Sequence, residues 1–148
     1  MSKLSDFLHP VTGGEEKEVI VSRRFVERDD AGNPILDDSG KMIPKPFRIR
    51  AIPQEENEAL VKAATMSVRN RNGQMESKFD KIRYSRSLVV AATVEPDFRS
   101  TDMCQAYGTL DPLEVPGKML LAGEYQALSD AIAEHSCIGA EFEEEAKN

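Results

Sequence analysis

Two short stretches in the first third of the chain have the residue pattern of β-strands. Val19-Ile20-Val21 is a β-branched cluster, and the strand that it predicts covers residues 18–26. Phe47-Arg48-Ile49-Arg50-Ala51 alternates apolar and basic side chains with a period of two, which is typical of a strand with one buried face. We expect these two strands to pair as an antiparallel hairpin.

A local duplication lies between the two predicted strands. Asp29-Asp30-Ala31-Gly32-Asn33-Pro34-Ile35 resembles Asp37-Asp38-Ser39-Gly40-Lys41-Met42-Ile43, and each copy is an aspartate–glycine turn signal followed by a short apolar piece. A calcium loop is excluded, because ligands at alternate positions, a glycine at the sixth position and a closing glutamate are missing. The sequence therefore predicts two turns flanking a short edge strand, or a projecting tongue, within residues 29–46.

The spacing of the apolar residues changes to that of helices from Pro53 onward. The predicted helices run from Pro53 to the turn Asn70–Gly73, from Phe79 to Val94, from Thr101 to Tyr107 and from about Gly123 to His135, with a polar loop up to Ser77 and a short helical start at Asp111–Glu114. The second of these helices is apolar almost all round in its latter half. We expect it to be the central helix of the core.

These patterns predict an α+β fold, in which an N-terminal antiparallel β-hairpin or small meander is followed by a C-terminal helical bundle. A length of 148 residues favours one domain, residues 1–148. Within it we expect a flexible N-terminal arm over 1–16, with a helical turn or two at Leu4–Leu8, and a hairpin over 17–52 with the projecting 29–46 loop. A helical part over 53–138 and an acidic tail over 139–148 complete the predicted organisation.

Charge is distributed unevenly along the chain. The net charge of −7 arises entirely within residues 111–148, which hold nine carboxylates and two lysines. Residues 69–86 instead hold six basic side chains and two acidic ones. Both segments can be ordinary solvated surface. The alternative is that the basic middle of the chain binds an acidic tail, either its own or that of a neighbouring copy. Binding to the tail of a neighbouring copy would give self-association.

The sequence contains no pattern that predicts catalysis or a cofactor. Glycine-rich phosphate loops, nucleophile elbows and paired-cysteine motifs are missing, and His9 and His135 have no clustered partner, so we expect neither an enzyme nor a metal site. Cys104 and Cys137 are expected to be reduced, buried side chains.

A pI near 4.9 and the lack of aromatic residues among the arginines argue against nucleic-acid binding. No apolar run approaches the length of a membrane span and no secretory signal is evident, which predicts a cytoplasmic protein.

A series of landmarks along the chain resembles one family of phage proteins. They are Val19-Ile20-Val21-Ser22-Arg23-Arg24-Phe25, Phe47-Arg48-Ile49-Arg50-Ala51-Ile52, Glu56-Asn57-Glu58-Ala59-Leu60, Phe79-Asp80, Ala91-Ala92-Thr93-Val94-Glu95-Pro96-Asp97-Phe98, Tyr107-Gly108, Leu120-Leu121-Ala122-Gly123-Glu124-Tyr125 and the Glu-Glu-Ala-Lys-Asn end. In order and spacing they are similar to the XkdN-like phage tail assembly chaperones. Ala122 stands where that family usually has proline, and the Asp29–Pro46 insertion is longer than the family's usual hairpin turn.

The resemblance implies a function without chemistry. Proteins of this family bind the tape measure protein while a phage or phage-like tail is built, help to recruit major tail tube protein subunits, and are absent from the mature particle. For this chain it implies residence in the host cytoplasm, and a short form that frameshifts at Lys147-Asn148 if the gene carries a slippery heptamer there. A structural tail component, such as a tube or initiator subunit, is the main alternative, and a generic α+β adaptor is the other.

We predict that the partner-binding groove lies between the last helix and the central helix. Its candidate contact residues are Met119, Leu121, Tyr125, Leu128 and Ile132. Leu128 and Ile132 are better explained as core residues. Met119 and Tyr125 are the better contact candidates, since methionine adapts to varied partners and tyrosine is common at interfaces.

Overall fold

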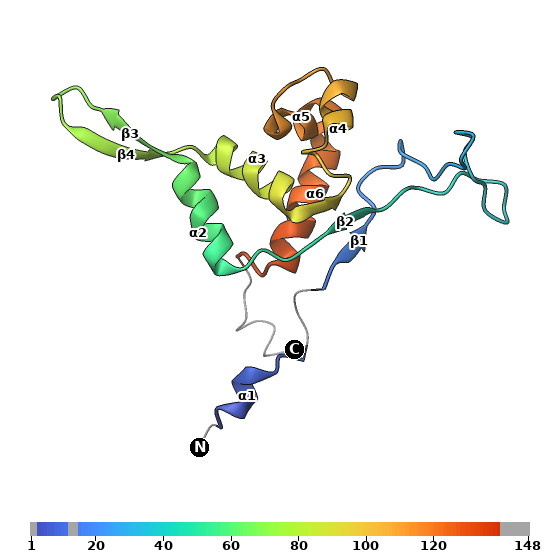
Figure 1. The fold of residues 1–148 in the computed structure, drawn as a ribbon, viewed down its shortest axis with the longest axis horizontal. Helices are drawn as coiled ribbons and strands as arrows, with labels where there is room; N and C mark the ends of the chain where they lie inside the picture. Colours follow the sequence, from blue (N-terminus) through green and yellow to red (C-terminus); the bar gives the residue numbers. More distant parts are fainter. Residues whose placement is uncertain (1–2, 12–14, 140–148) are drawn as a thin grey trace.

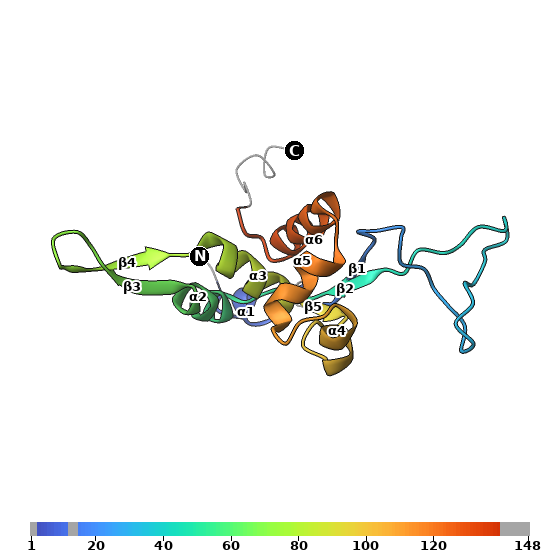
Figure 2. The same cartoon turned by 90° about the horizontal axis from the view of Figure 1, so that it is seen from above.

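Two arms extend in opposite directions from a helical body (Figures 1 and 2). The computed structural model describes residues 3–11 and 15–139. Its elements are α1 (Ser5–Leu8), β1 (Lys17–Val19), β2 (Phe47–Ile49), α2 (Gln54–Ala63), β3 (Thr65–Arg69), β4 (Met75–Phe79), α3 (Lys81–Ala92), β5 (Thr93–Glu95), α4 (Thr101–Ala106), the 3-10 turn η1 (Pro112–Glu114), α5 (Val115–Met119) and α6 (Ala122–His135). The predicted acidic tail and the Lys147-Asn148 frameshift site lie outside the described residues, apart from Gly139.

A three-stranded antiparallel sheet in the order β1-β2-β5 supports one side of the body. The predicted pairing of the first two strands is confirmed, with Val19 opposite Phe47, although β1 ends at Val19 instead of continuing to residue 26. The third strand, β5, was predicted as the end of a helix. The helix stops at Ala92 because the Ala92 carbonyl accepts a hydrogen bond from the Arg50 N–H (2.8 Å), and the β-branched Thr93 then pairs with Ile49.

Residues 20–46 form the first arm, here called the double-turn arm. Its backbone is joined by isolated bridges, Val26 to Pro44, Arg28 to Pro34 and Leu36 to Met42. Each predicted turn is present, and the two are built alike: Asp29 Oδ1 accepts from the N–H groups of Ala31 and Asn33, and Asp37 Oδ1 accepts from those of Ser39 and Lys41, at 2.8–3.0 Å. The duplicated sequence thus becomes a duplicated turn at the tip of a projecting arm.

The second arm is the antiparallel β3–β4 hairpin, here called the basic hairpin. The prediction of a helix to residue 70 followed by a polar loop was wrong: α2 ends at Ala63 and five residue pairs, Thr65–Phe79 to Arg69–Met75, form a ladder. Asn70 builds the turn, since its Oδ1 accepts from the N–H groups of Asn72 and Gln74 (3.0 Å each). The Asp80 carboxylate then caps the next helix by accepting from the Arg83 N–H (3.0 Å), so α3 begins at Lys81.

The core gathers where the sheet meets α3 and α6. The expectation that α3 is the central helix is confirmed by the burial of every residue from Leu88 to Ala92. The largest completely buried side chains are Phe47, Ile49, Val89, Phe98, Val115, Leu128 and Ile132. Each such burial contributes about 1.5–3 kcal/mol relative to exposure.

A bidentate ion pair holds α2 against this core. Arg50 Nη1 and Nη2 donate to the two carboxylate oxygens of Glu56 at 2.9 and 2.6 Å, while Nε donates to the Ala91 carbonyl at 3.0 Å. The Arg50 hydrogen bond lowers the pKa of the Glu56 carboxyl below its ordinary value. The α+β class therefore fits the structure, but the predicted order is only partly confirmed, because the basic hairpin interrupts the helical part and β5 returns to the first sheet.

Candidate functional site

The segment Leu121-Ala122-Gly123-Glu124-Tyr125 is the start of α6. Leu121 is in extended conformation (φ −72°, ψ 160°), and Glu124, at the third helical position, accepts the Leu121 N–H at 2.8 Å with Oε1. A glutamate at this position satisfies one of the free N–H groups at a helix start and also favours the helix dipole. Ala122 is the first helical residue, where proline is well tolerated. The Leu121–Tyr125 motif, which is part of the family resemblance, therefore determines the residue at which α6 begins.

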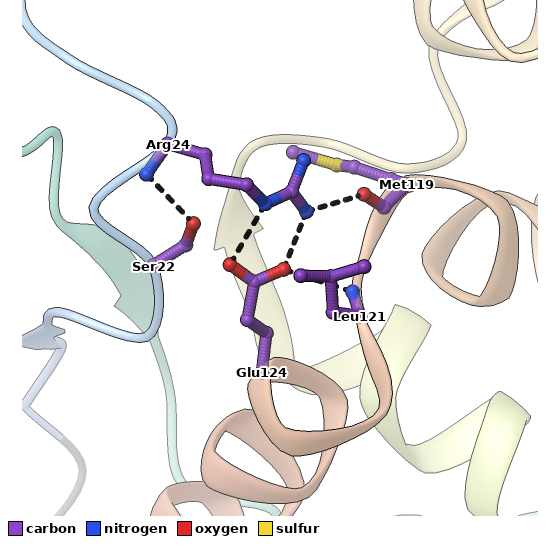
Figure 3. Close-up of polar contacts among 5 residues, drawn as sticks. All are labelled: Ser22, Arg24, Met119, Leu121 and Glu124. Carbon is purple, nitrogen blue, oxygen red and sulfur yellow. Dashed lines mark hydrogen bonds and ion pairs between the residues drawn. The ribbon is translucent and has the colours of Figure 1, made fainter.

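The same glutamate ties the double-turn arm to the body (Figure 3). Arg24 Nε donates to Glu124 Oε2 (3.0 Å), Arg24 Nη2 donates to Glu124 Oε1, and the same Nη2 donates to the Met119 carbonyl (3.0 Å). The buried Ser22 hydroxyl accepts from the Arg24 N–H (3.0 Å). Hydrogen bonds from Arg24, from the Ser22 hydroxyl and from the Leu121 N–H together lower the pKa of Glu124 from 4.5 to about 2.

A groove lies between α3 and the α5–α6 junction. Its main cavity has a volume of about 550 Å³, with Lys81, Ile82, Ser85 and Arg86 on the α3 side and Gly117, Leu120, Ala122 and Tyr125 on the other. A second cavity of about 300 Å³, lined by Arg86, Glu114, Gly117 and Lys118, adjoins it and shares Arg86 and Gly117 with it. We call the two cavities together the α3–α6 groove.

Contacts between the two walls fix the shape of the groove. The Tyr125 and Ser85 hydroxyls are hydrogen bonded across it at 2.9 Å. Ile82 forms part of the apolar lining and has 67% of its surface exposed, whereas Leu120 beneath has only 7% exposed. Lys81, Arg86 and Lys118 place positive charge at the edges. The groove can therefore accept a large apolar side chain whose neighbours are anionic or polar.

The predicted contact residues are distributed over the core, the groove and the surface. Leu128 and Ile132 are fully buried. They are therefore core residues, which is the explanation that the sequence favoured for these two positions. The Met119 side chain is also buried, with 8% exposed, so only its carbonyl is engaged at the surface, by Arg24. Leu121 is 60% exposed outside the groove lining, and Tyr125 is half-buried in the groove wall. Partner binding by these five residues stays a prediction.

Two features of the site were not predicted from the sequence. Ile82 falls within the helix predicted over Phe79–Val94, but the first turn of α3 extends beyond the core, so its side chain is exposed. Arg24 was assigned to a strand and had no signal that linked it to Glu124, a residue 100 positions away in the sequence. The basic cluster at residues 69–86 was noticed, and Lys81 and Arg86 of that cluster line the groove.

No chemistry other than binding is suggested by the arrangement of side chains. Among the residues that the structure describes, no three histidine, cysteine, aspartate or glutamate side chains gather as a metal site would require. Cys104 is buried as expected, but the prediction for Cys137 was wrong, because Cys137 is exposed just after α6 with a φ of 59°. Within the same described part, no helix is long and apolar enough to cross a membrane.

Comparisons with known proteins place the chain in a family. Residues 4–147 match the family described as phage XkdN-like tail assembly chaperone proteins. The chain belongs to that family. It is 36% identical over 139 residues to the phage-like element PBSX protein XkdN of Bacillus subtilis (strain 168), a match that covers 90% of this chain and 85% of that protein.

The second set of similarities concerns YqbN, an uncharacterized protein. This chain is 34% identical over 113 residues to YqbN of Bacillus subtilis (strain 168), covering 75% of this chain and 67% of that protein. The crystal structure of YqbN superimposes with a TM-score of 0.68 at 28% identity, covering 93% of this chain and 98% of the YqbN chain. The XkdN-like fold described here is therefore shared along almost the whole chain.

Proposed function

We propose that this XkdN-like protein binds the tape measure protein of a phage or phage-like tail during assembly, and helps to recruit major tail tube protein subunits to it. The observation that supports this proposal is the α3–α6 groove, which is lined by the first residue of α6 and by the exposed side chain of Ile82. The protein would act in the host cytoplasm and be absent from the mature particle.

The groove suits a helical client. A tape measure protein is a long, helix-rich chain whose exposed apolar stripes associate with one another when they are uncovered. An amphipathic helix binds such grooves by inserting its apolar side chains, and a cavity of about 550 Å³ accommodates one or two of them. Contacts of this size are weak individually, which suits a chaperone that binds in many copies and must be released.

Blocking the groove without disturbing the core tests the proposal. Gly117 lines both cavities, and a side chain added there meets no atom within 4 Å, so Gly117→Leu fills the groove while leaving the fold intact. Gly123, in the first turn of α6, is equally open but does not line the groove, so Gly123→Leu is the matched control. We expect the tape measure protein, co-expressed from the neighbouring gene, to stay soluble and co-purify with the wild type and with Gly123→Leu only. Equal co-purification with Gly117→Leu would contradict the use of this groove.

A structural tail component, such as a tube or initiator subunit, is the second candidate function. The observation that favours it is the pair of arms that project from the body, because a projecting arm can contact a neighbouring subunit (Figure 1). Fractionation separates the two functions. A chaperone is present in the induced cell and missing from purified particles, whereas a tube or initiator subunit is found in the particles in fixed stoichiometry.

We also propose that the gene carries a frameshift site at the codons for Lys147-Asn148, so that two proteins are made from it. Ala146-Lys147-Asn148 can be encoded by GCA AAA AAC, which contains a slippery heptamer. Sequencing the gene tests this directly. Other codons at Lys147-Asn148, or no open reading frame downstream in the shifted frame, would contradict it.

A further inference from the structure

The cations of the α3–α6 groove have no anionic partner in the described part of the chain. Lys81, Arg86 and Lys118 form none of the ion pairs found among these residues, and all three are exposed. Glu114 is the one carboxylate that lines the groove, and its Oε2 accepts from the Thr109 hydroxyl at 2.8 Å. Ile82, Leu120 and Tyr125 contribute apolar surface to the same cavity as Lys81 and Arg86. The groove thus matches a segment with one large apolar side chain between carboxylates.

The chain itself contains a segment with that chemistry. Glu141-Phe142-Glu143-Glu144-Glu145 places one aromatic side chain among four glutamates, with no cation in the five residues. An aromatic anchor surrounded by charges complementary to the rim is the pattern of a strong interface contact. The segment lies outside the described residues and carries four of the chain's 26 carboxylates.

Chain length favours a neighbouring copy as the source of this segment. Ile138 is held at the end of α6, since its N–H donates to the Ala133 carbonyl at 2.8 Å. Ala133 lies eight residues after the groove residue Tyr125, or about 12 Å along the axis of α6. The four residues from Ile138 to Phe142 span at most about 14 Å. Phe142 therefore reaches the groove of its own chain only if nearly the whole of this span is directed back along α6, whereas a second copy imposes no such restriction.

We propose that the α3–α6 groove of one copy binds the Glu141–Glu145 segment of a second copy, with Phe142 in the cavity and the glutamates paired with Lys81, Arg86 and Lys118. Such a contact joins two different surfaces, so it either closes into a ring or continues as a row of copies. This association needs no client and does not rest on the proposed function. If the tape measure protein also uses the groove, the segment competes with it.

Complementation between two damaged copies provides a sharp test. The first variant, Lys81→Glu with Arg86→Glu, keeps the acidic segment and loses the groove charges. The second ends at Gly139, so it keeps the groove and loses the segment. Each variant alone should sediment as a monomer of about the 16.5 kDa chain mass across a roughly hundredfold concentration range, whereas an equimolar mixture should form a complex of one copy of each.

The intact protein supplies the remaining measurements. Its average mass should rise with concentration, and Phe142→Ala should weaken this association about tenfold or more. Raising the salt from about 0.1 M to about 1 M, which shortens the Debye length from about 10 Å to about 3 Å, should weaken it as well. Lys41→Glu, which reverses an exposed cation at the tip of the double-turn arm, is the matched control and should change nothing.

Three results would overturn the proposal. The first is a wild-type protein that stays monomeric at every concentration, which includes the case of a segment bound within its own chain. The second is self-association that survives removal of residues 140–148. The third is a mixture of the two damaged variants that fails to form a complex although the circular dichroism spectrum shows that each is folded. Failure of tape measure binding in the Gly117→Leu experiment has no bearing on these results.

Discussion

The body and the arms of this molecule are stabilised in different ways. The body has a core in which Phe47, Leu128 and Ile132 come from distant parts of the sequence and have at most 2% of their surface exposed. The arms are held by local turns and short ladders, and they leave large apolar side chains in solvent: Ile35, Leu36 and Met42 on the double-turn arm, and Met66, Met75 and Phe79 on the basic hairpin. Two-stranded hairpins of this kind are marginal by themselves. The body should therefore fold independently of the arms, and the arms should become more ordered when a partner covers them.

The largest test of this difference compares two leucines. Leu128→Ala removes a completely buried side chain from α6 and should lower the free energy of unfolding by about 2–5 kcal/mol. Leu36→Ala, at a position 56% exposed on the double-turn arm, should change it by no more than about 0.5 kcal/mol. Urea denaturation followed by circular dichroism measures both. A cost at Leu36 as large as that at Leu128 would mean that the arm belongs to the cooperative unit.

The next test concerns the polar contacts of Glu124 that connect the double-turn arm to α6. Because the pKa of Glu124 falls from 4.5 to about 2 on folding, the unfolded chain takes up this proton first as the solution is acidified. The stability that the Arg24–Glu124 pair contributes is therefore complete above about pH 4.5 and is lost between pH 4.5 and 2. Glu124→Gln should be less stable than the wild type at neutral pH, and the two should converge as the pH approaches 2.

Hydrogen exchange separates two roles of Glu124, which are the ion pair with Arg24 and the hydrogen bond from the Leu121 N–H. In Glu124→Gln the amides of the double-turn arm near Arg24 should exchange faster, while those of the basic hairpin should be unchanged. Arg24→Gln serves as the control, because it removes the ion pair but leaves Glu124 to accept the Leu121 N–H. If the wild type and Glu124→Gln keep the same stability difference from pH 7 to pH 2, the pair does not titrate as described.

The basic hairpin offers a smaller and more local effect. Gly73 has a φ of +78°, a conformation that costs other residues about 1–2 kcal/mol, so Gly73→Ala should loosen the turn by about that amount. Amide exchange across β3–β4 should increase, while the urea midpoint of the body stays the same. A lower midpoint for the whole protein would show that the hairpin and the body unfold together.

The three turns of the arms show how far the sequence could predict the fold. Asp29, Asp37 and Asn70 each accept two backbone N–H groups with a side-chain oxygen, and a glycine follows three residues later in all three turns. The two aspartate turns were predicted because a repeat made them visible. The asparagine turn was interpreted as a helix end, because an asparagine–glycine pair after an apolar helical stretch fits both structures. Only the pairing of β3 with β4 decides between them, and a local pattern does not contain that pairing.

The candidate site, like the turns of the arms, was predictable only where a local sequence pattern determines the structure. The start of α6 follows from a local pattern. Tyr125, predicted as a partner contact, lines the cavity beside α3, and its contact with a partner stays a prediction. Burial of Met119 and exposure of Ile82 depend on how α3 and α5 pack, which a helical period does not specify. The contact between Arg24 and Glu124 joins the first strand region to the last helix, so it could be recognised only in three dimensions.

The smallest predicted effect lies at Ala122, where the family resemblance of the sequence implies a proline. Ala122 is the first residue of α6, and Leu121 before it is already extended (φ −72°, ψ 160°), as a residue preceding proline must be. Ala122→Pro should therefore fit without strain and raise the free energy of unfolding by about 0.4–1 kcal/mol, because proline restricts the unfolded chain. Gln126→Pro, in the interior of the same helix, is the contrasting control and should destabilise by about 3 kcal/mol or more. Urea denaturation of both variants measures the difference. A destabilised Ala122→Pro protein would mean that α6 begins differently here, and the Arg24–Glu124 geometry that joins arm to body would have to be reconsidered with it.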